Sequence, residues 1–225
     1  MLWEVDGKTM KAVVFDMDGV LFDTERLCME SWIAVAEKEG LPDMEIIFPR
    51  CIGLNANDSR QVVLDAYGQD FDFAGFRELA SAWFWDYIKK NGLPVKPGVR
   101  ELLKWLKQEG RIVGLASSTR RSSVISHLEQ AELTEYFQAV ITGDMVEHSK
   151  PLPDIYLLAC RELGVEPGEA YAIEDSPNGI RSAYAAGLHP IMVPDMIAPD
   201  EEMEQKSDRI FRDLAEVLDY MKQRK

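Results

Sequence analysis

Short apolar runs alternate with helical patterns along this chain, and no other feature of the sequence constrains the fold as strongly. The runs span residues 11–16, 111–117, 139–142, 170–175 and 188–193. A short, continuous apolar run is typical of a strand that is buried on both faces of a parallel sheet. Strands that alternate with helices form βαβ units, so the sequence predicts an α/β fold with a doubly wound, Rossmann-like parallel sheet.

The ends of three helical patterns carry residue types that start or stop helices. Ser176 is a favourable N-cap, Pro177 suits the first helical position, and Gly187 can adopt the left-handed conformation that follows a helix. Two other helices are predicted to stop at Gly110 and at Gly164. These boundaries place the predicted helices between the predicted strands.

The pattern changes between residues 24 and 92, where helical segments occur without a strand-like run. We therefore predict two domains. Residues 1–23 and 93–225 form the α/β core, and residues 24–92 form a small helical domain inserted after the first strand. Aromatic residues cluster between positions 71 and 87, and we expect their rings to form the core of a small helical bundle.

The charge of the chain excludes some classes of partner. Lysine and arginine number 25 against 39 aspartate and glutamate residues, which gives a formal net charge of −14. Such a chain repels polyanions and has no basic run to bind them, so we expect no nucleic-acid partner. No apolar segment approaches the roughly 18–20 residues of a membrane span, and the three cysteines show neither disulfide nor zinc spacing. We expect a monomer in the reducing cytoplasm, without a membrane partner.

Polar residues stand where three of the predicted strands end. Asp16 and Asp18 follow the first run, Ser117 closes the second, and Glu174 and Asp175 close the fourth. The carboxyl ends of parallel strands share one edge of the sheet, where open α/β sheets bind ligands. The sequence thus predicts a ligand site that is rich in carboxylates.

Four short motifs occur in the order in which the haloacid dehalogenase (HAD) superfamily carries them. The sequence Asp16-Met-Asp18-Gly-Val resembles the first motif of that family, and Ser117 resembles the phosphate-binding residue of the second. Lys150 resembles the lysine of the third motif, and Glu174 and Asp175 resemble the metal-binding acids of the fourth. The resemblance covers the chain from about residue 11 to the C-terminus, and the helical insert is similar to the C1 cap of the family.

The resemblance implies a phosphohydrolase with a covalent intermediate. Asp16 would attack phosphorus to form an aspartyl phosphate, while Asp18 would protonate the leaving oxygen and then activate the hydrolytic water. Lys150, Ser117 and Ser118 would hold the phosphate oxygens.

Phosphoryl transfer also requires that charge on the phosphate oxygens be neutralised, and Mg²⁺ prefers hard oxygen ligands. Asp16 and Asp175, together with a backbone carbonyl at Asp18, would suffice to bind Mg²⁺ with water and phosphate. Glu174 would bind the ion directly or through water.

The substrate implied is a small phosphorylated metabolite, for example a sugar phosphate, and the main alternative is a phosphomutase that resembles β-phosphoglucomutase. In that mutase family a histidine follows the first motif, and basic residues of the cap hold the distal phosphate. Here Cys28 occupies the position of the histidine, and Ile52 and Ala56 occupy the basic positions. These departures favour hydrolysis, with Arg50 and Arg60 as the nearest basic residues that could substitute.

The same motifs leave two further alternatives to a phosphohydrolase. A dehalogenase uses an aspartate nucleophile without Mg²⁺ and without a second acid, so the presence of Asp18 opposes it. A non-catalytic binding module is the other alternative, because a fold alone never determines function.

Overall fold

The computed structural model describes residues 4–5, 8–52 and 56–224 of the chain. The chain divides into two compact units. The larger unit combines Met1–Phe22 with Val95–Lys225, and the smaller unit consists of Asp23–Pro94.

The larger unit contains a six-stranded sheet in the order β5-β4-β3-β6-β7-β8, and every neighbouring pair is parallel. Its strands are β3 (Ala12–Phe15), β4 (Ile112–Ser117), β5 (Ala139–Thr142), β6 (Ala170–Glu174), β7 (His189–Met192) and β8 (Arg209–Ile210). All residues of β3 and β6 are buried, as expected for central strands covered on both faces. The predicted α/β class and doubly wound sheet are confirmed. A short antiparallel hairpin, β1 (Glu4–Val5) and β2 (Lys8–Thr9), precedes β3.

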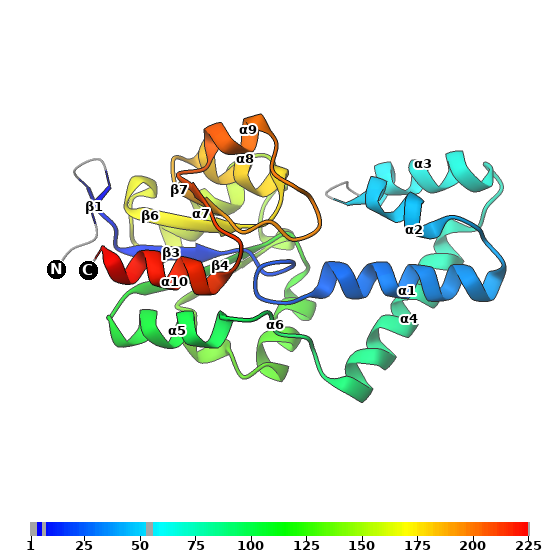
Figure 1. Cartoon of the computed structure of the whole chain (residues 1–225), viewed down its shortest axis with the longest axis horizontal. Coiled ribbons are helices and arrows are strands. Elements are labelled where there is room, and N and C mark those ends of the chain that lie inside the picture. Colours follow the sequence, from blue (N-terminus) through cyan, green and yellow to red (C-terminus); the bar gives the residue numbers. More distant parts are fainter. Residues whose placement is uncertain (1–3, 6–7, 53–55, 225) are drawn as a thin grey trace. The chain divides into compact units, whose positions relative to one another are not determined.

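Helices cover both faces of this sheet (Figure 1). They are α5 (Val99–Gln108), α6 (Arg121–Gln130), α7 (Asp154–Leu163), α8 (Pro177–Ala186), α9 (Glu201–Lys206) and α10 (Leu214–Gln223). Short 3-10 turns η2 (Thr134–Tyr136), η3 (Gly143–Met145) and η4 (Pro167–Glu169) lie in the connections. On one face, small side chains of β3 pack against α7, with Ala12, Val14, Ile155 and Ala159 in one buried cluster. On the other face, α5 packs against α10.

The predicted helix boundaries are confirmed. The Ser176 hydroxyl accepts a hydrogen bond from the N–H of Gly179 at 3.2 Å, Pro177 is the first residue of α8, and Gly187 follows the helix with φ 82°. Gly164 likewise ends α7 in the left-handed conformation, with φ 68°. Helix α5 ends at Gln108, two residues before Gly110.

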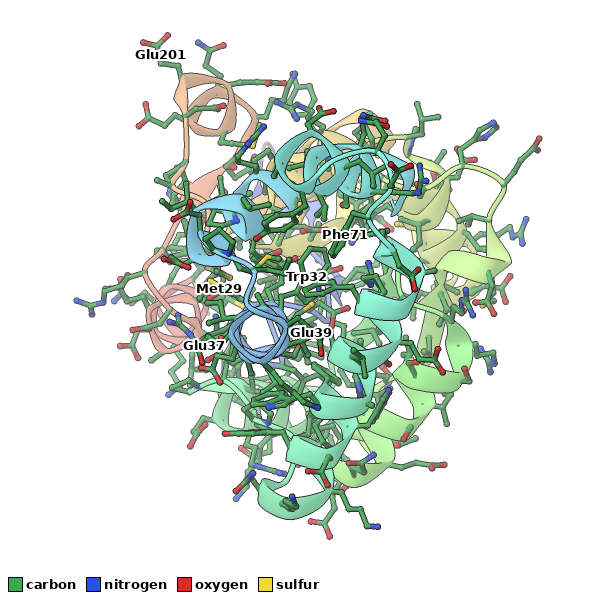
Figure 2. The ribbon with its side chains drawn as sticks, turned by 90° about the vertical axis from the view of Figure 1, so that its right-hand side faces the viewer. Met29, Trp32, Glu37, Glu39, Phe71 and Glu201 are labelled. Carbon is green, nitrogen blue, oxygen red and sulfur yellow. The ribbon has the colours of Figure 1, made fainter. Side chains whose placement is uncertain are left out.

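The smaller unit consists of helices, and no strand occurs within its described residues 23–52 and 56–94. Its elements are α1 (Thr24–Glu39), α2 (Met44–Ile47), η1 (Phe48–Cys51), α3 (Ala56–Tyr67) and α4 (Phe73–Asn91). The ring of Trp32 lies edge-on to Phe48, Phe73 and Phe76, with centroid separations of 5.1, 5.9 and 5.4 Å. Figure 2 shows Trp32 and Phe71 in the interior between the helices of this unit.

The expectation that the whole aromatic cluster forms a core is wrong for the second half of α4. Phe73 and Phe76 are buried, but Trp83, Phe84 and Tyr87 are only half-buried and Trp85 is 39% exposed. Because successive helical residues are about 100° apart, rings at positions 83, 84 and 85 point in different directions and cannot share one core.

Among the described residues, no helix combines the length and the apolar character that crossing a membrane requires.

Candidate active site

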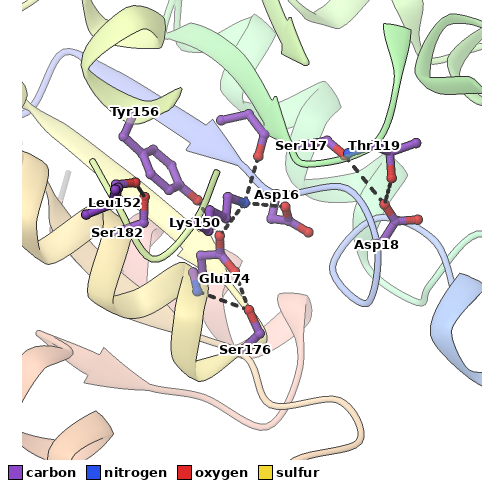
Figure 3. A network of polar contacts seen from close by, with 12 residues as sticks. Asp16, Asp18, Ser117, Thr119, Lys150, Leu152, Tyr156, Glu174, Ser176 and Ser182 are labelled. Atoms are coloured by element: carbon purple, nitrogen blue, oxygen red, sulfur yellow. Dashed lines mark hydrogen bonds and ion pairs between the residues drawn. The ribbon is translucent and has the colours of Figure 1, made fainter. Parts of the chain in front are cut away.

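The predicted site residues of the core come together at the carboxyl edge of the sheet (Figure 3). β3 pairs with β4 on one side and with β6 on the other, so the ends of these three strands adjoin. Asp16 directly follows β3, Ser117 ends β4, and Glu174 and Asp175 stand at the end of β6. The strand order also reverses at β3, and such a switch point is where open α/β sheets hold ligands.

Lys150 joins the ends of these three strands through its ammonium group. Its Nζ lies 2.5 Å from Oδ1 of Asp16 and 2.6 Å from Oε1 of Glu174, and it donates a hydrogen bond to the carbonyl of Ala116 at 2.9 Å. Burial alone would lower the pKa of Lys150, but the carboxylates of Asp16 and Glu174 outweigh it and raise that pKa above its ordinary value. The buried lysine therefore stays charged and counters the charge of both acids.

The loop that carries Lys150 is fixed to the neighbouring helix. The hydroxyl of Ser182, a fully buried residue of α8, donates a hydrogen bond to the carbonyl of Leu152 at 2.6 Å. This contact is visible beside Lys150 in Figure 3. The ammonium group is thus held in place by packing and hydrogen bonds, as a preorganised electrostatic site requires.

Three buried carboxylates form a group that could hold a metal ion. Asp16, Glu174 and Asp175 each offer one oxygen, and these oxygens lie within 4.8 Å of one another. Burial raises the pKa of Asp16 well above its ordinary value, Lys150 lowers it, and the carboxylates of Glu174 and Asp18 raise it further. One lysine does not fully compensate this negative charge, and a donor set made only of carboxylates suits a hard divalent cation such as Mg²⁺.

The acids of this group differ in how far their oxygens are already engaged. Glu174 is fully buried, and its Oε1 accepts hydrogen bonds from Lys150 and, at 2.6 Å, from the Tyr156 hydroxyl. Its Oε2 accepts from the Ser176 hydroxyl at 3.3 Å. The side chain of Asp18 does not belong to the group; the contribution predicted for Asp18 was its backbone carbonyl, and it stays a prediction.

Two glycines allow the backbone to approach these acids closely. Gly19 has φ +81°, and a Cβ atom there would lie 2.1 Å from Oδ2 of Asp175. A Cβ atom on Gly179 would lie 1.9 Å from the carboxylate of Glu174. Neither contact is sterically possible, so Gly19 and Gly179 allow the acids to pack closely against the backbone.

Asp18 faces the loop that follows β4. Its Oδ2 accepts a hydrogen bond from the Thr119 hydroxyl at 2.8 Å, and the hydroxyl of the fully buried Ser117 lies 3.5 Å from the same oxygen. The N–H of Thr119 in turn donates to the Ser117 hydroxyl at 3.1 Å. Ser118, which was also predicted to bind phosphate, is exposed on this loop.

Sequence reasoning missed the side chains of Tyr156 and Thr119 in this network. Burial and the neighbouring Glu174 carboxylate raise the pKa of Tyr156 well above its ordinary value, so its hydroxyl keeps the proton that it donates to Glu174. Its ring also lies 5.2 Å from Nζ of Lys150. Tyr156 belongs to the buried face of α7, where a tyrosine looks like any core residue, whereas Thr119 could have been suspected from its place beside Ser117 and Ser118.

Known proteins resemble this chain over most of its length. A model of the haloacid dehalogenase-like hydrolase family matches residues 10–187. The Phosphorylated carbohydrates phosphatase of Thermotoga maritima is 35% identical over 186 residues, which is 81% of this chain and 84% of that protein. The Beta-phosphoglucomutase of Bacillus subtilis is 32% identical over 208 residues, 88% of this chain and 91% of that protein.

A solved structure supports the same assignment. The HAD family hydrolase from Deinococcus radiodurans R1, crystallised with bound phosphate and sodium, matches with a TM-score of 0.80 and 26% identity over 96% of each chain. The resemblance that the four sequence motifs carry is thereby confirmed. With the family model matching most of its length, this chain belongs to the haloacid dehalogenase-like hydrolases.

Proposed function

We propose that this protein is a Mg²⁺-dependent phosphatase that hydrolyses a small phosphorylated metabolite, of the sugar phosphate class, through an aspartyl phosphate on Asp16. The observation that carries the proposal is the buried contact of Lys150 with Asp16 and Glu174 at the switch point of the sheet. Relatives that act on phosphorylated carbohydrates support the substrate class.

Each polar group of the site has a task in this reaction. A carboxylate oxygen of Asp16 attacks phosphorus, and Asp18 gives a proton to the leaving oxygen and then takes one from the attacking water. Lys150 and the hydroxyl of Ser117 hold the phosphate oxygens, with Ser118 on the same loop. Asp16, Asp175 and the backbone at Asp18 would hold Mg²⁺, which would neutralise negative charge on the phosphoryl group. Glu174 would bind the ion directly or through water, and its carboxylate also holds Lys150.

The smaller unit is assigned the role of a cap. We expect residues 24–92 to close the site against bulk water and to select the organic part of the substrate. The direct test of the proposal is a screen of phosphorylated metabolites for release of inorganic phosphate, with Mg²⁺ present and absent. Failure of all phosphate monoesters in such a screen would contradict the proposed function.

Exhaustive chelation should abolish the activity, and added Mg²⁺ should restore it, because three carboxylates and one lysine leave the site short of positive charge. Replacing Asp175 with alanine should raise the Mg²⁺ concentration for half-maximal activity by more than the roughly 10–100-fold that loss of an outer-shell partner costs. A Mg²⁺ titration of the initial rate measures both effects.

The matched control for that titration is Asp219→Asn, which removes an exposed carboxylate from α10. Its titration should match that of the wild type. Full activity after chelation, or an Asp175→Ala titration that superimposes on the wild-type curve, would show that the carboxylate group does not bind the ion.

The phosphomutase alternative is kept because a β-phosphoglucomutase is among the relatives. Within the smaller unit, Cys28 is half-buried on α1, Ile52 follows η1, and the side chain of Ala56 lies outside the described residues. Arg50 and Arg60, the basic residues that could hold a distal phosphate, are exposed. A cap without cations at the compared positions is poorly suited to binding a bisphosphate at both ends.

We therefore expect stoichiometric release of inorganic phosphate from a monophosphate ester, with little transfer to a second hydroxyl. The measurement uses β-glucose 1-phosphate with Mg²⁺ and a trace of the bisphosphate, and follows free phosphate and glucose 6-phosphate together. Rapid formation of glucose 6-phosphate without phosphate release would establish the mutase reaction instead.

A further inference from the structure

Thr119 and Asp18 are 101 residues apart in the sequence, but the Thr119 hydroxyl donates a hydrogen bond to the Asp18 carboxylate. The distance from Oγ1 of Thr119 to Oδ2 of Asp18 is 2.8 Å, which is typical of a well-formed O–H···O bond. The Ser117 hydroxyl approaches the same oxygen only to 3.5 Å, at the limit for such a bond. Of these two hydroxyls, that of Thr119 therefore makes the better hydrogen bond to Oδ2.

The backbone of Thr119 is itself held from two sides. Its N–H donates to the hydroxyl of Ser117, which is fully buried at the end of β4, and its carbonyl accepts a hydrogen bond from the N–H of Gly143 at 3.1 Å. Gly143 packs so closely that a Cβ atom there would lie 2.2 Å from the carbonyl oxygen of Ser118. The hydroxyl of Thr119 thus projects from a loop with little freedom to move, as a preorganised site requires.

We propose that Thr119 is a positioning residue for the reaction, whose hydroxyl bonds Oδ2 of Asp18 and so orients the Asp18 carboxyl group toward the leaving oxygen and the water. The inference rests on the proposed function, in which Asp18 is the acid and base. A hydroxyl suits this task because its O–H donates a directional hydrogen bond to a carboxyl oxygen. Without this bond, the Asp18 side chain loses a restraint that favours its present rotamer.

Kinetics of three variants test this role. Thr119→Val keeps the shape of the side chain but removes the hydroxyl, and it should lower kcat by about 10- to 100-fold, the loss expected when a catalytic group is misplaced by about 1 Å. KM should change by no more than roughly twofold, because the bond is made to Asp18 and not to substrate. Thr119→Ser should recover most of the lost activity, and Thr134→Val, a matched change at an exposed threonine of η2, should behave like the wild type.

Three kinetic results would overturn the inference. Thr119→Val could show wild-type kcat, or it could raise KM alone, which would make Thr119 a substrate contact. The third result is a Thr119→Ser variant as slow as Thr119→Val, which would show that the lost activity reflects packing of the side chain and not the hydroxyl.

A structural measurement separates this inference from the proposed function. Crystal structures of the wild type and the Thr119 variants without substrate should show the Asp18 carboxylate in a changed rotamer in Thr119→Val and in its original one in Thr119→Ser. An unchanged Asp18 in Thr119→Val would overturn the positioning role, whatever the enzyme hydrolyses. A wild type inactive on every phosphate monoester would instead overturn the proposed function, and the rotamer comparison would still decide whether Thr119 orients Asp18.

Discussion

Replacing Asp16 with asparagine should lower kcat by about 10⁴-fold or more, the scale of loss seen when a covalent nucleophile is removed. The amide has nearly the same shape as the carboxylate, and its oxygen can still accept the hydrogen bond from Lys150, but it cannot attack phosphorus. Because burial raises the pKa of Asp16, a neutral group at this position should be tolerated by the fold. Steady-state kinetics and thermal unfolding of the same preparation measure the two effects.

Asp18→Asn is the matched comparison, because it removes the second acid of the motif and leaves the nucleophile intact. It should also be strongly impaired, and it should accumulate an aspartyl phosphate if hydrolysis of the intermediate slows more than its formation. Mass spectrometry of the quenched protein would locate the phosphate. Phosphate on a residue other than Asp16, or substantial turnover by carefully purified Asp16→Asn, would remove Asp16 from the role of nucleophile.

Replacing Lys150 with methionine should damage both activity and stability. The change keeps most of the side-chain volume but leaves the buried carboxylates of Asp16 and Glu174 without their shared cation. Removing one partner of a buried ion pair typically costs about 3–5 kcal/mol of unfolding free energy. The kcat should fall by about 10²- to 10³-fold, as when one donor to a developing charge is lost. Urea unfolding and initial rates measure the two losses.

The unfolding experiment has an internal test and a matched control. Mg²⁺ in the unfolding buffer should recover part of the stability lost in Lys150→Met, because a bound cation offsets the same carboxylate charge. Lys107→Met removes an exposed lysine that pairs with Glu135 on the surface, and it should leave the unfolding midpoint unchanged. A Lys150→Met protein as stable as the wild type would show that Lys150 does not compensate the buried acids.

The central strands could be predicted from the sequence because burial on both faces requires an uninterrupted apolar run. All residues of β3 and β6 are buried. Asp16 directly follows β3, and Asp175 directly follows β6. The strands β1, β2 and β8 have two residues each, which is too short for any period to appear. Among the described residues, β1 and β2 pair only with each other, and β8 pairs only with β7 at the edge of the sheet.

The sequence by itself determined the fold class and the edge of the sheet at which the polar residues meet. Parallel strands point the same way, so residues that end them, such as Asp16, Ser117 and Glu174, must lie at a common edge. Only the tertiary structure decided which side chains touch there. Tyr156 reaches Glu174 across 18 residues, and Thr119 reaches Asp18 across 101. Such contacts depend on strand order and side-chain direction, which no local pattern of residues encodes.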